Sequence, residues 1–243
     1  MGKLKIVSRS AEPFRDRREA GALLGRELHH LKGKNPLVLG IPRGGIVVAR
    51  ELARLLEGEL DLVISRKIGA PGNPELAIGA VGEDGRVFLH GWMLSSAGAD
   101  AGYLEKEKER QIQEIRRRNA CYREAYPRID PKDRVVVLTD DGIATGATFQ
   151  AAIWSVKNER PAVLIAAVPV APQNALGEIQ EDADEVICLK LPHYFTTVGQ
   201  FYDRFEQIDD EEVIEILRQE TARREFLPKP GKDREEAGSR PGK

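Results

Sequence analysis

Asp140 and Asp141 are adjacent carboxylates whose setting in the sequence points to ligand chemistry. They directly follow residues 135–138, a short apolar run that is typical of a strand buried on both faces. Residues 142–148, GIATGAT, come next and lead into a helical pattern. Backbone N–H groups and hydroxyls at the start of a helix bind phosphate, whereas the two acids suit sugar hydroxyls or a Mg²⁺ ion. The stretch therefore predicts a site for a phosphorylated sugar.

Other readings of this stretch are weaker. It has no lysine after the second glycine, so it is not a GxxxxGK[ST] loop, and it has no GxGxxG pattern. An ordinary strand–loop–helix turn with acids at the helix cap is the plain alternative. Because a cap needs one acid and no second pair of hydroxyl and glycine, we favour the ligand site.

Residues 42–45, Pro-Arg-Gly-Gly, form a second glycine-containing loop between a buried strand pattern and a helical pattern. The two glycines permit close approach of another group to the backbone, and Arg43 places a permanent positive charge at the start of the helix. An arginine before a glycine pair is common in turns. The loop therefore indicates a ligand site only in combination with the two acids of the first stretch.

The sequence VVVLTDDGIATGAT resembles the phosphoribosyl-pyrophosphate motif of type I phosphoribosyltransferases, and IPRGG resembles the pyrophosphate loop of that family. The resemblance extends over residues 36–191. It implies Mg²⁺-dependent transfer of ribose 5-phosphate from phosphoribosyl pyrophosphate to a nitrogenous base, with release of pyrophosphate. It also implies a cis peptide bond between Pro42 and Arg43.

The resemblance assigns roles to individual residues. Asp140 and Asp141 are expected to hold the ribose hydroxyls and the metal, and Arg43 is expected to bind the departing pyrophosphate. The ligand-binding residues would be those of the two loops and two cations after a later strand: Gly142, Ile143, Ala144, Thr145, Gly146, Ala147, Thr148, Pro42, Gly44, Gly45, Arg66 and Lys67. For the last two, an exposed charge pair at a strand end is a nearly equal alternative.

One departure from the family bears on the acceptor. Hypoxanthine and guanine enzymes carry an acid, which acts as a base toward the purine, where this chain has Ala144. The sequence is closer to adenine-type enzymes and to uncharacterised bacterial members whose C-terminal part is similar to CLKLPHYFTTVGQFYDRF. The alternative function is a non-catalytic module of the same fold that senses phosphoribosyl pyrophosphate or a nucleotide. Such regulators usually add a nucleic-acid-binding part, and this chain has no helix-turn-helix signature.

Short apolar runs alternate with helical patterns, which predicts an α/β fold with a doubly wound, mainly parallel sheet. Ligands of such folds bind at the carboxyl ends of the strands, where both glycine loops lie. A hairpin is expected around residues 83–85, matching the flexible loop of the family, and a long charged surface helix over residues 103–125.

We expect one domain over residues 1–227, with a core at 36–191, a C-terminal hood segment at 192–227 and a disordered tail at 228–243. Aromatic residues gather at 192–205 in a chain that is only 6% aromatic. They suit either a stacking platform for a flat base or the packing seam of a loop, and the sequence favours neither.

Composition limits partners and location. The 243 residues are 41% hydrophobic and 31% charged, with a formal net charge of −2. Because the chain carries no excess of positive charge, we expect no nucleic-acid partner. The basic block at 116–118 suits a solvated helix face. No apolar stretch is long enough to span a bilayer and no signal peptide is apparent, so we expect a cytoplasmic protein without membrane contact. Cys121 and Cys188 are expected to be reduced, buried thiols. A homodimer is left open.

Overall fold

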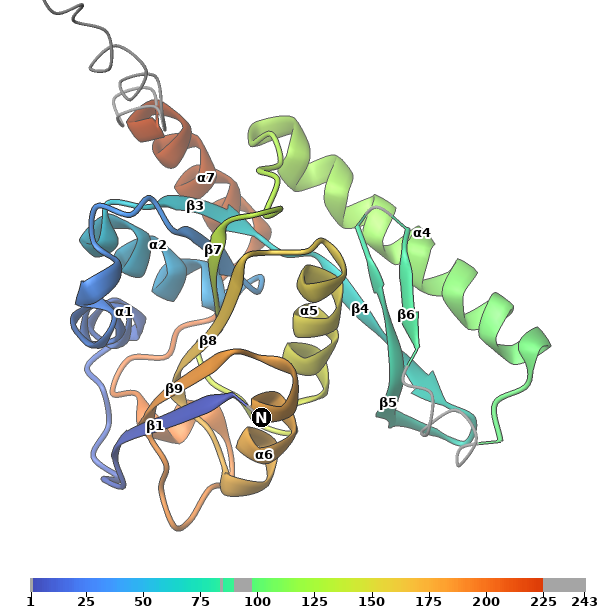
Figure 1. Cartoon of the computed structure of the whole chain (residues 1–243), viewed down its shortest axis with the longest axis horizontal. Helices are drawn as coiled ribbons and strands as arrows, with labels where there is room; N and C mark the ends of the chain where they lie inside the picture. The colour runs from blue at the N-terminus through green and yellow to red at the C-terminus, as the bar shows by residue number, and fades with distance from the viewer. Residues whose placement is uncertain (1, 84, 90–97, 225–243) are drawn as a thin grey trace, which may run out of the picture.

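The main sheet has six strands that all pair in parallel. The computed structural model describes residues 2–83, 85–89 and 98–224 (Figure 1). The strand order is β1-β9-β8-β7-β2-β3. The strands are β1 (Lys3–Ser8), β2 (Leu37–Gly40), β3 (Glu59–Leu62), β7 (Val135–Thr139), β8 (Val163–Val170) and β9 (Glu185–Lys190). The central strands β2, β7 and β8 are continuous buried apolar runs, as strands covered on both faces must be.

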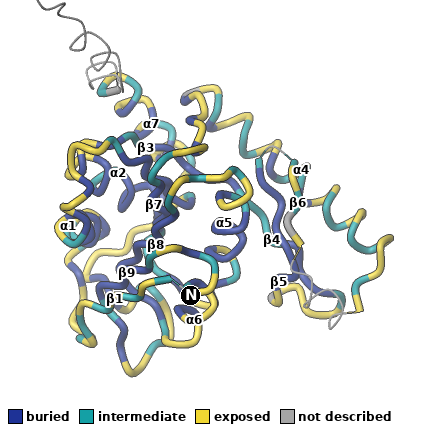
Figure 2. Tube along the Cα trace, in the orientation of Figure 1, coloured by how far each residue is buried: buried dark blue, intermediate teal, exposed yellow. Residues whose placement is uncertain are grey.

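Helices cover both faces of this sheet. In Figure 1, α1 (Arg17–Glu27) and α2 (Gly44–Leu56) pack together on one side, and α5 (Ala147–Asn158) and α6 (Gln173–Asp182) lie on the other. A short 3₁₀ helix, η1 (His29–Leu31), follows α1. The predicted doubly wound α/β fold with a mainly parallel sheet is confirmed, and Figure 2 shows the buried residues concentrated between the two helical layers.

A second, antiparallel sheet lies beside α5. It has the strand order β4-β5-β6 and is formed by β4 (Ser65–Ala70), β5 (Asn73–Gly82) and β6 (Val87–Leu89). The long helix α4 (Ala101–Ala125) packs along it (Figure 1). The hairpin expected at residues 83–85 is present, with Gly85 N donating to Gly82 O, although residue 84 lies outside the described residues. The sequence LDLVIS at residues 60–65 is typical of one short strand, but it contains the end of β3 and the start of β4, which belong to different sheets.

The C-terminal part contains the 3₁₀ helix η2 (Val198–Phe201) and the helix α7 (Asp210–Arg224). The expected tail at 228–243 and the last residues of the hood segment lie outside the described residues, and the division into core and hood stays a prediction. No helix among the described residues is both long and apolar enough to cross a membrane.

One expectation for the cysteines is wrong. Cys188 is buried in β9, as expected, but Cys121 is exposed on α4. The reason is that α4 buries only a narrow stripe, which includes Ile115 and Tyr122, and Cys121 falls on the outer side of that stripe.

Candidate functional site

The two acids lie at the carboxyl end of β7, against the glycine loop that follows β2. A Cβ atom added to Gly44 would lie 1.9 Å from Asp141 Oδ2, and one added to Gly45 would lie 2.8 Å from Asp140 Oδ1. Any side chain at either glycine would therefore collide with a carboxylate. The structure brings together the first stretch and the second loop, and the glycine pair is what allows the contact.

Asp141 is held by a buried arginine. Arg17, the first residue of α1, donates from Nε to Asp141 Oδ2 at 2.8 Å and from Nη1 to the carbonyl oxygen of Glu206 at 2.8 Å. The side chains of Arg17 and Asp141 are only 9% and 16% exposed. The guanidinium carbon of Arg17 also lies 3.9 Å from the centre of the Phe205 ring, a cation–π contact. The negative charge of Asp141 is thus already paired with the positive charge of Arg17.

Asp140 is in a different electrostatic position. Its Oδ1 accepts a bond from the backbone N–H of Asp141 at 2.8 Å. Burial raises the pKa of Asp140 well above its usual range, and the negative charge of Asp141 raises it further. Burial also raises the pKa of Asp141, but Arg17 opposes that rise. Asp140 therefore carries the less compensated charge of the two, and a ligand or cation that relieves it is favoured there.

The donor set at the acids suits a metal that is shared with a substrate. The described residues contain no group of three or more His, Cys, Asp or Glu side chains that would hold a metal alone. Two adjacent carboxylates with raised pKa values nevertheless fit Mg²⁺, which commonly binds one or two carboxylates and completes its shell with substrate phosphates and water.

The loop at residues 142–148 has one buried anchor and an exposed rim. Ile143 is buried and donates its N–H to Val170 O at 2.9 Å, while Ala144 and Thr145 are exposed and Thr148 is exposed at the start of α5. Gly146 has φ of 86°, a left-handed conformation that favours glycine, and α5 begins at the next residue. The loop therefore exposes Ala144, Thr145 and Thr148 at a helix N-terminus, an arrangement that suits phosphate.

Arg43 lies at the start of α2, and its side chain is 42% exposed. Its Nη1 is 3.9 Å from Asp210 Oδ1, at the start of α7. Asp210 also accepts a 2.5 Å bond from the hydroxyl of Tyr122. The peptide bond between Pro42 and Arg43 is cis, so the expectation of a cis bond is confirmed.

Arg66 and Lys67 are half-buried in β4 and not a freely solvated pair. Arg66 Nε donates to Gln111 Oε1 of α4 at 2.9 Å. Both cations line a cavity that Thr148 of the loop at residues 142–148 also lines. They therefore lie beside the start of α5.

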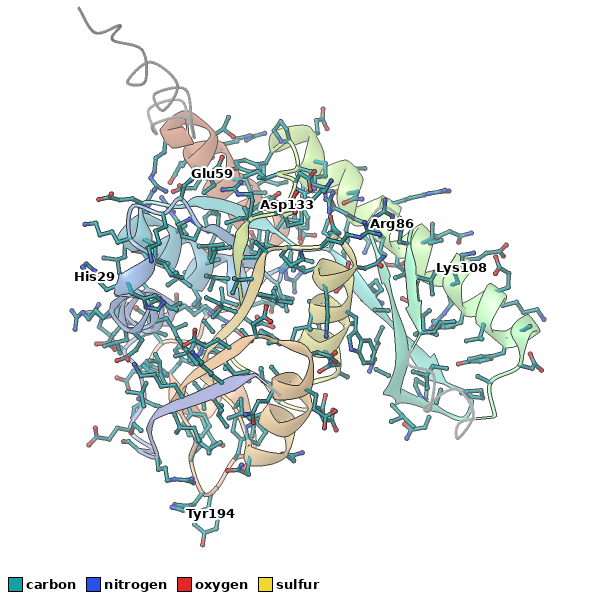
Figure 3. The ribbon with its side chains drawn as sticks, viewed as in Figure 1. His29, Glu59, Arg86, Lys108, Asp133 and Tyr194 are labelled. Carbon is teal, nitrogen blue, oxygen red and sulfur yellow. The ribbon has the colours of Figure 1, made fainter. Side chains whose placement is uncertain are left out.

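The aromatic segment is mainly a packing seam. Phe201 and Tyr202 are buried, and the ring of Tyr202 lies 5.0 Å from that of Phe205 and 5.4 Å from that of Phe14. The hydroxyl of Tyr202 donates to the backbone carbonyl of Asp141 at 2.5 Å. Tyr194 is 89% exposed and points away from the molecule (Figure 3). The seam thus supports the acids, and Phe205, 37% exposed, offers part of a ring to solvent.

Arg17 and Tyr202 were not singled out as site residues by the sequence. Arg17 directly follows the helix cap Asp16 and precedes Arg18, so nothing in the local pattern separates it from a solvated charge. Tyr202 lies in the aromatic cluster that the sequence did flag, but its contact with Asp141 depends on tertiary structure.

These features define a class. A six-stranded parallel sheet carries two glycine loops and two acids at the carboxyl ends of adjacent strands, where ligands of open α/β sheets bind. Residues 17–204 match the family model described as "Phosphoribosyl transferase domain". The chain belongs to the phosphoribosyltransferase family.

Individual relatives support the same family assignment. The structure of TT1426 from Thermus thermophilus is 49% identical in sequence, with a TM-score of 0.81 and coverage of 85% of this chain and 98% of that chain. Two curated proteins from two strains of Mycobacterium tuberculosis, each named "Putative phosphoribosyl transferase", are 40% identical over 213 residues. The match covers 88% of this chain and 48% of each relative, so the chain spans about half the length of these relatives.

Proposed function

We propose that this protein transfers ribose 5-phosphate from phosphoribosyl pyrophosphate to a nitrogenous base and releases pyrophosphate, with Mg²⁺ as cofactor. Membership of the family supports the reaction class. The observation that carries the proposal is the contact between the glycine pair of residues 44–45 and the carboxylates of Asp140 and Asp141. A phosphate loop alone would suit many nucleotides, but acids placed between two anion-binding loops suit a sugar with phosphates at both ends.

Each loop takes one end of this substrate. The amides and hydroxyls of residues 144–148 would hold the 5-phosphate at the N-terminus of α5. Gly44, Gly45 and the Arg43 guanidinium would hold the pyrophosphate at the N-terminus of α2. Asp140, whose charge is the less compensated, would accept hydrogen bonds from the ribose hydroxyls between the two ends.

The chemical step is a displacement at the anomeric carbon. The bond from that carbon to the pyrophosphate oxygen breaks, a bond to a base nitrogen forms, and the base releases a proton to water. Positive charge develops on the sugar ring and would be stabilised by the carboxylate of Asp140, while Arg43 would stabilise negative charge on the leaving group. When bound, Mg²⁺ would supply further positive charge to the pyrophosphate oxygens.

A screen for pyrophosphate release tests the proposal. The protein is incubated with phosphoribosyl pyrophosphate, Mg²⁺ and one base at a time, and pyrophosphate is measured. We expect release with at least one base and a large loss in Asp140→Asn. If the protein bound phosphoribosyl pyrophosphate but released no pyrophosphate with any base, the proposal of catalysis would be wrong. The alternative function, a non-catalytic sensing module, would then be favoured.

A further inference from the structure

Arg17 joins the acid pair to the C-terminal segment. Its Nε donates to Asp141 Oδ2 at 2.8 Å, and its Nη1 donates to the carbonyl oxygen of Glu206 at 2.8 Å. Its guanidinium carbon lies 3.9 Å from the centre of the Phe205 ring. Two hydrogen bonds and a ring contact, made to two distant parts of the chain, therefore fix the planar guanidinium in one orientation.

The pair of Arg17 and Asp141 also packs against the first glycine of the 44–45 pair. A Cβ atom added to Gly44 would lie 1.9 Å from Asp141 Oδ2 and 2.9 Å from Arg17 Nε. The hydrogen bond between the two side chains is therefore packed against the backbone of Gly44. A shift of either side chain would change the surface on which this loop rests.

Tyr202 holds the backbone of the same acid. Its ring is buried, and its hydroxyl donates to the backbone carbonyl of Asp141 at 2.5 Å. At the next residue, a Cβ atom added to Gly142 would lie 2.5 Å from a side-chain carbon of Val198. The C-terminal segment thus restrains the backbone of Asp141, while Arg17 restrains its side chain.

The C-terminal segment is itself attached to the residues that precede α1. Phe14 N donates to Phe201 O at 2.7 Å, and Asp203 N donates to Phe14 O at 2.8 Å. Helix α1 begins shortly afterwards at Arg17. These bonds fix the start of α1 relative to the C-terminal segment, so the backbone that carries Arg17 is restrained as well.

The surroundings of Arg17 favour a role toward the acids over direct contact with a ligand. Its side chain is only 9% exposed, so it offers little surface to a ligand. Its positive charge opposes the rise in the pKa of Asp140 as well as that of Asp141, although it is bonded only to Asp141. A buried cation that faces two neighbouring carboxylates holds them together against their mutual repulsion.

We propose that Arg17 is a positioning residue of the site, which fixes Asp141 against Gly44 and affects the binding of phosphoribosyl pyrophosphate only through Asp141. The inference rests on the proposed function for the identity of the ligand. An acid that is already held in place spares the ligand the cost of ordering it, which is the usual gain from a preorganised site.

A double-mutant cycle on ligand affinity tests the inference. Calorimetry measures the dissociation constant of phosphoribosyl pyrophosphate with Mg²⁺ for the wild type, Arg17→Gln, Asp141→Asn and the double variant. We expect each single variant to bind about tenfold more weakly than the wild type. The double variant should bind about as well as the single variants, because an effect that acts through one partner is lost only once.

Two further variants separate positioning from charge. Arg18→Gln removes the same charge from the next residue of α1, whose side chain is exposed, and should change the affinity by no more than about twofold. Arg17→Lys keeps the charge but lacks the planar fork, so it should restore part of the affinity that Arg17→Gln loses. Thermal melting verifies that each variant is folded, and Arg17→Lys replaces Arg17→Gln in the cycle if the latter does not fold.

Three results would overturn the inference. These are an unchanged affinity in Arg17→Gln, equal losses in Arg17→Gln and Arg18→Gln, or a loss from the Arg17 substitution that persists in the Asp141→Asn background. The last result would indicate direct contact between Arg17 and the ligand. Failure of the proposed function appears differently, because the wild type itself would then not bind phosphoribosyl pyrophosphate, and the inference would fail with it.

Discussion

At the scale of single residues, Asp140 and Asp141 are neighbours with unequal partners. Asp141 is paired with the buried guanidinium of Arg17, whereas Asp140 faces a like charge and accepts a backbone bond. We therefore expect Asp141→Asn to lower the free energy of unfolding by about 1–3 kcal/mol, since Arg17 loses a charge-assisted hydrogen bond. Asp140→Asn should keep or raise stability because it removes repulsion. Urea unfolding at neutral pH measures both, and equal losses would contradict this account.

The two cysteines should differ in reactivity. Burial raises the pKa of the Cys188 thiol to about 12, and Cys121 is exposed. A thiolate is the reactive form, and at a pH of about 8 a thiol with so high a pKa is almost entirely protonated. One equivalent of a thiol-specific reagent should react quickly with the native protein, and the second only after unfolding. Cys121→Ser should abolish the fast phase, and rapid reaction of two thiols in the native protein would disprove the assignment.

Sequence reasoning found the residues of the motifs and missed those that support them. Asp140, Asp141 and both glycine loops were visible because each has a local pattern. Arg17 was not, because its partner Asp141 is 124 residues away and no local pattern marks the pair. The exposure of Cys121 was missed for a related reason: a charged helix with a narrow apolar stripe does not show from sequence which side a small residue takes.

At the scale of elements, the elements that position the site were predicted better than the peripheral ones. The strands β2 and β7 and the helices after them follow directly from buried apolar runs and glycine loops. The edge strand β1 was not predicted, because its short sequence KLKIVS alternates exposed and half-buried residues and is stabilised by pairing with β9 at the other end of the chain. The split between β3 and β4 was also hidden, because residues 60–65 read as one run.

The helix α7 is anchored to the last turn of α2 by one buried acid. Glu220 is 2% exposed and bonds to Arg54 of α2 at 2.9 Å and to Arg223 at 2.7 Å. We expect Glu220→Ala to lower the free energy of unfolding by about 1.5–3 kcal/mol, because its partly exposed partners lose charge-assisted bonds but regain water.

Amide hydrogen exchange should show that the change is local to this helix, with faster exchange in α7. Glu215→Ala on the exposed side of α7 is the control and should change stability by no more than about 0.5 kcal/mol. Equal effects of the two substitutions would show that the buried cluster does not anchor α7.

At the scale of the whole molecule, the site depends on parts of the chain that are far apart in sequence. The acids come from the end of β7, the glycine pair from α2, the arginine that holds Asp141 from α1, and the tyrosine bonded to its backbone from the C-terminal segment. The chain spans about half the length of its curated relatives from Mycobacterium tuberculosis, and the described residues nevertheless contain both loops and the acids. We therefore predict that the described residues suffice to bind phosphoribosyl pyrophosphate, the substrate of the proposed function.

The most direct test of that claim is a calorimetric titration of phosphoribosyl pyrophosphate into the protein, with and without Mg²⁺. The wild type should bind, and more tightly with Mg²⁺. Asp140→Asn should weaken binding about tenfold or more while remaining folded, whereas Asp130→Asn, an exposed acid away from the site, should not. Absence of binding by the wild type, or binding that neither Mg²⁺ nor Asp140→Asn alters, would contradict the account.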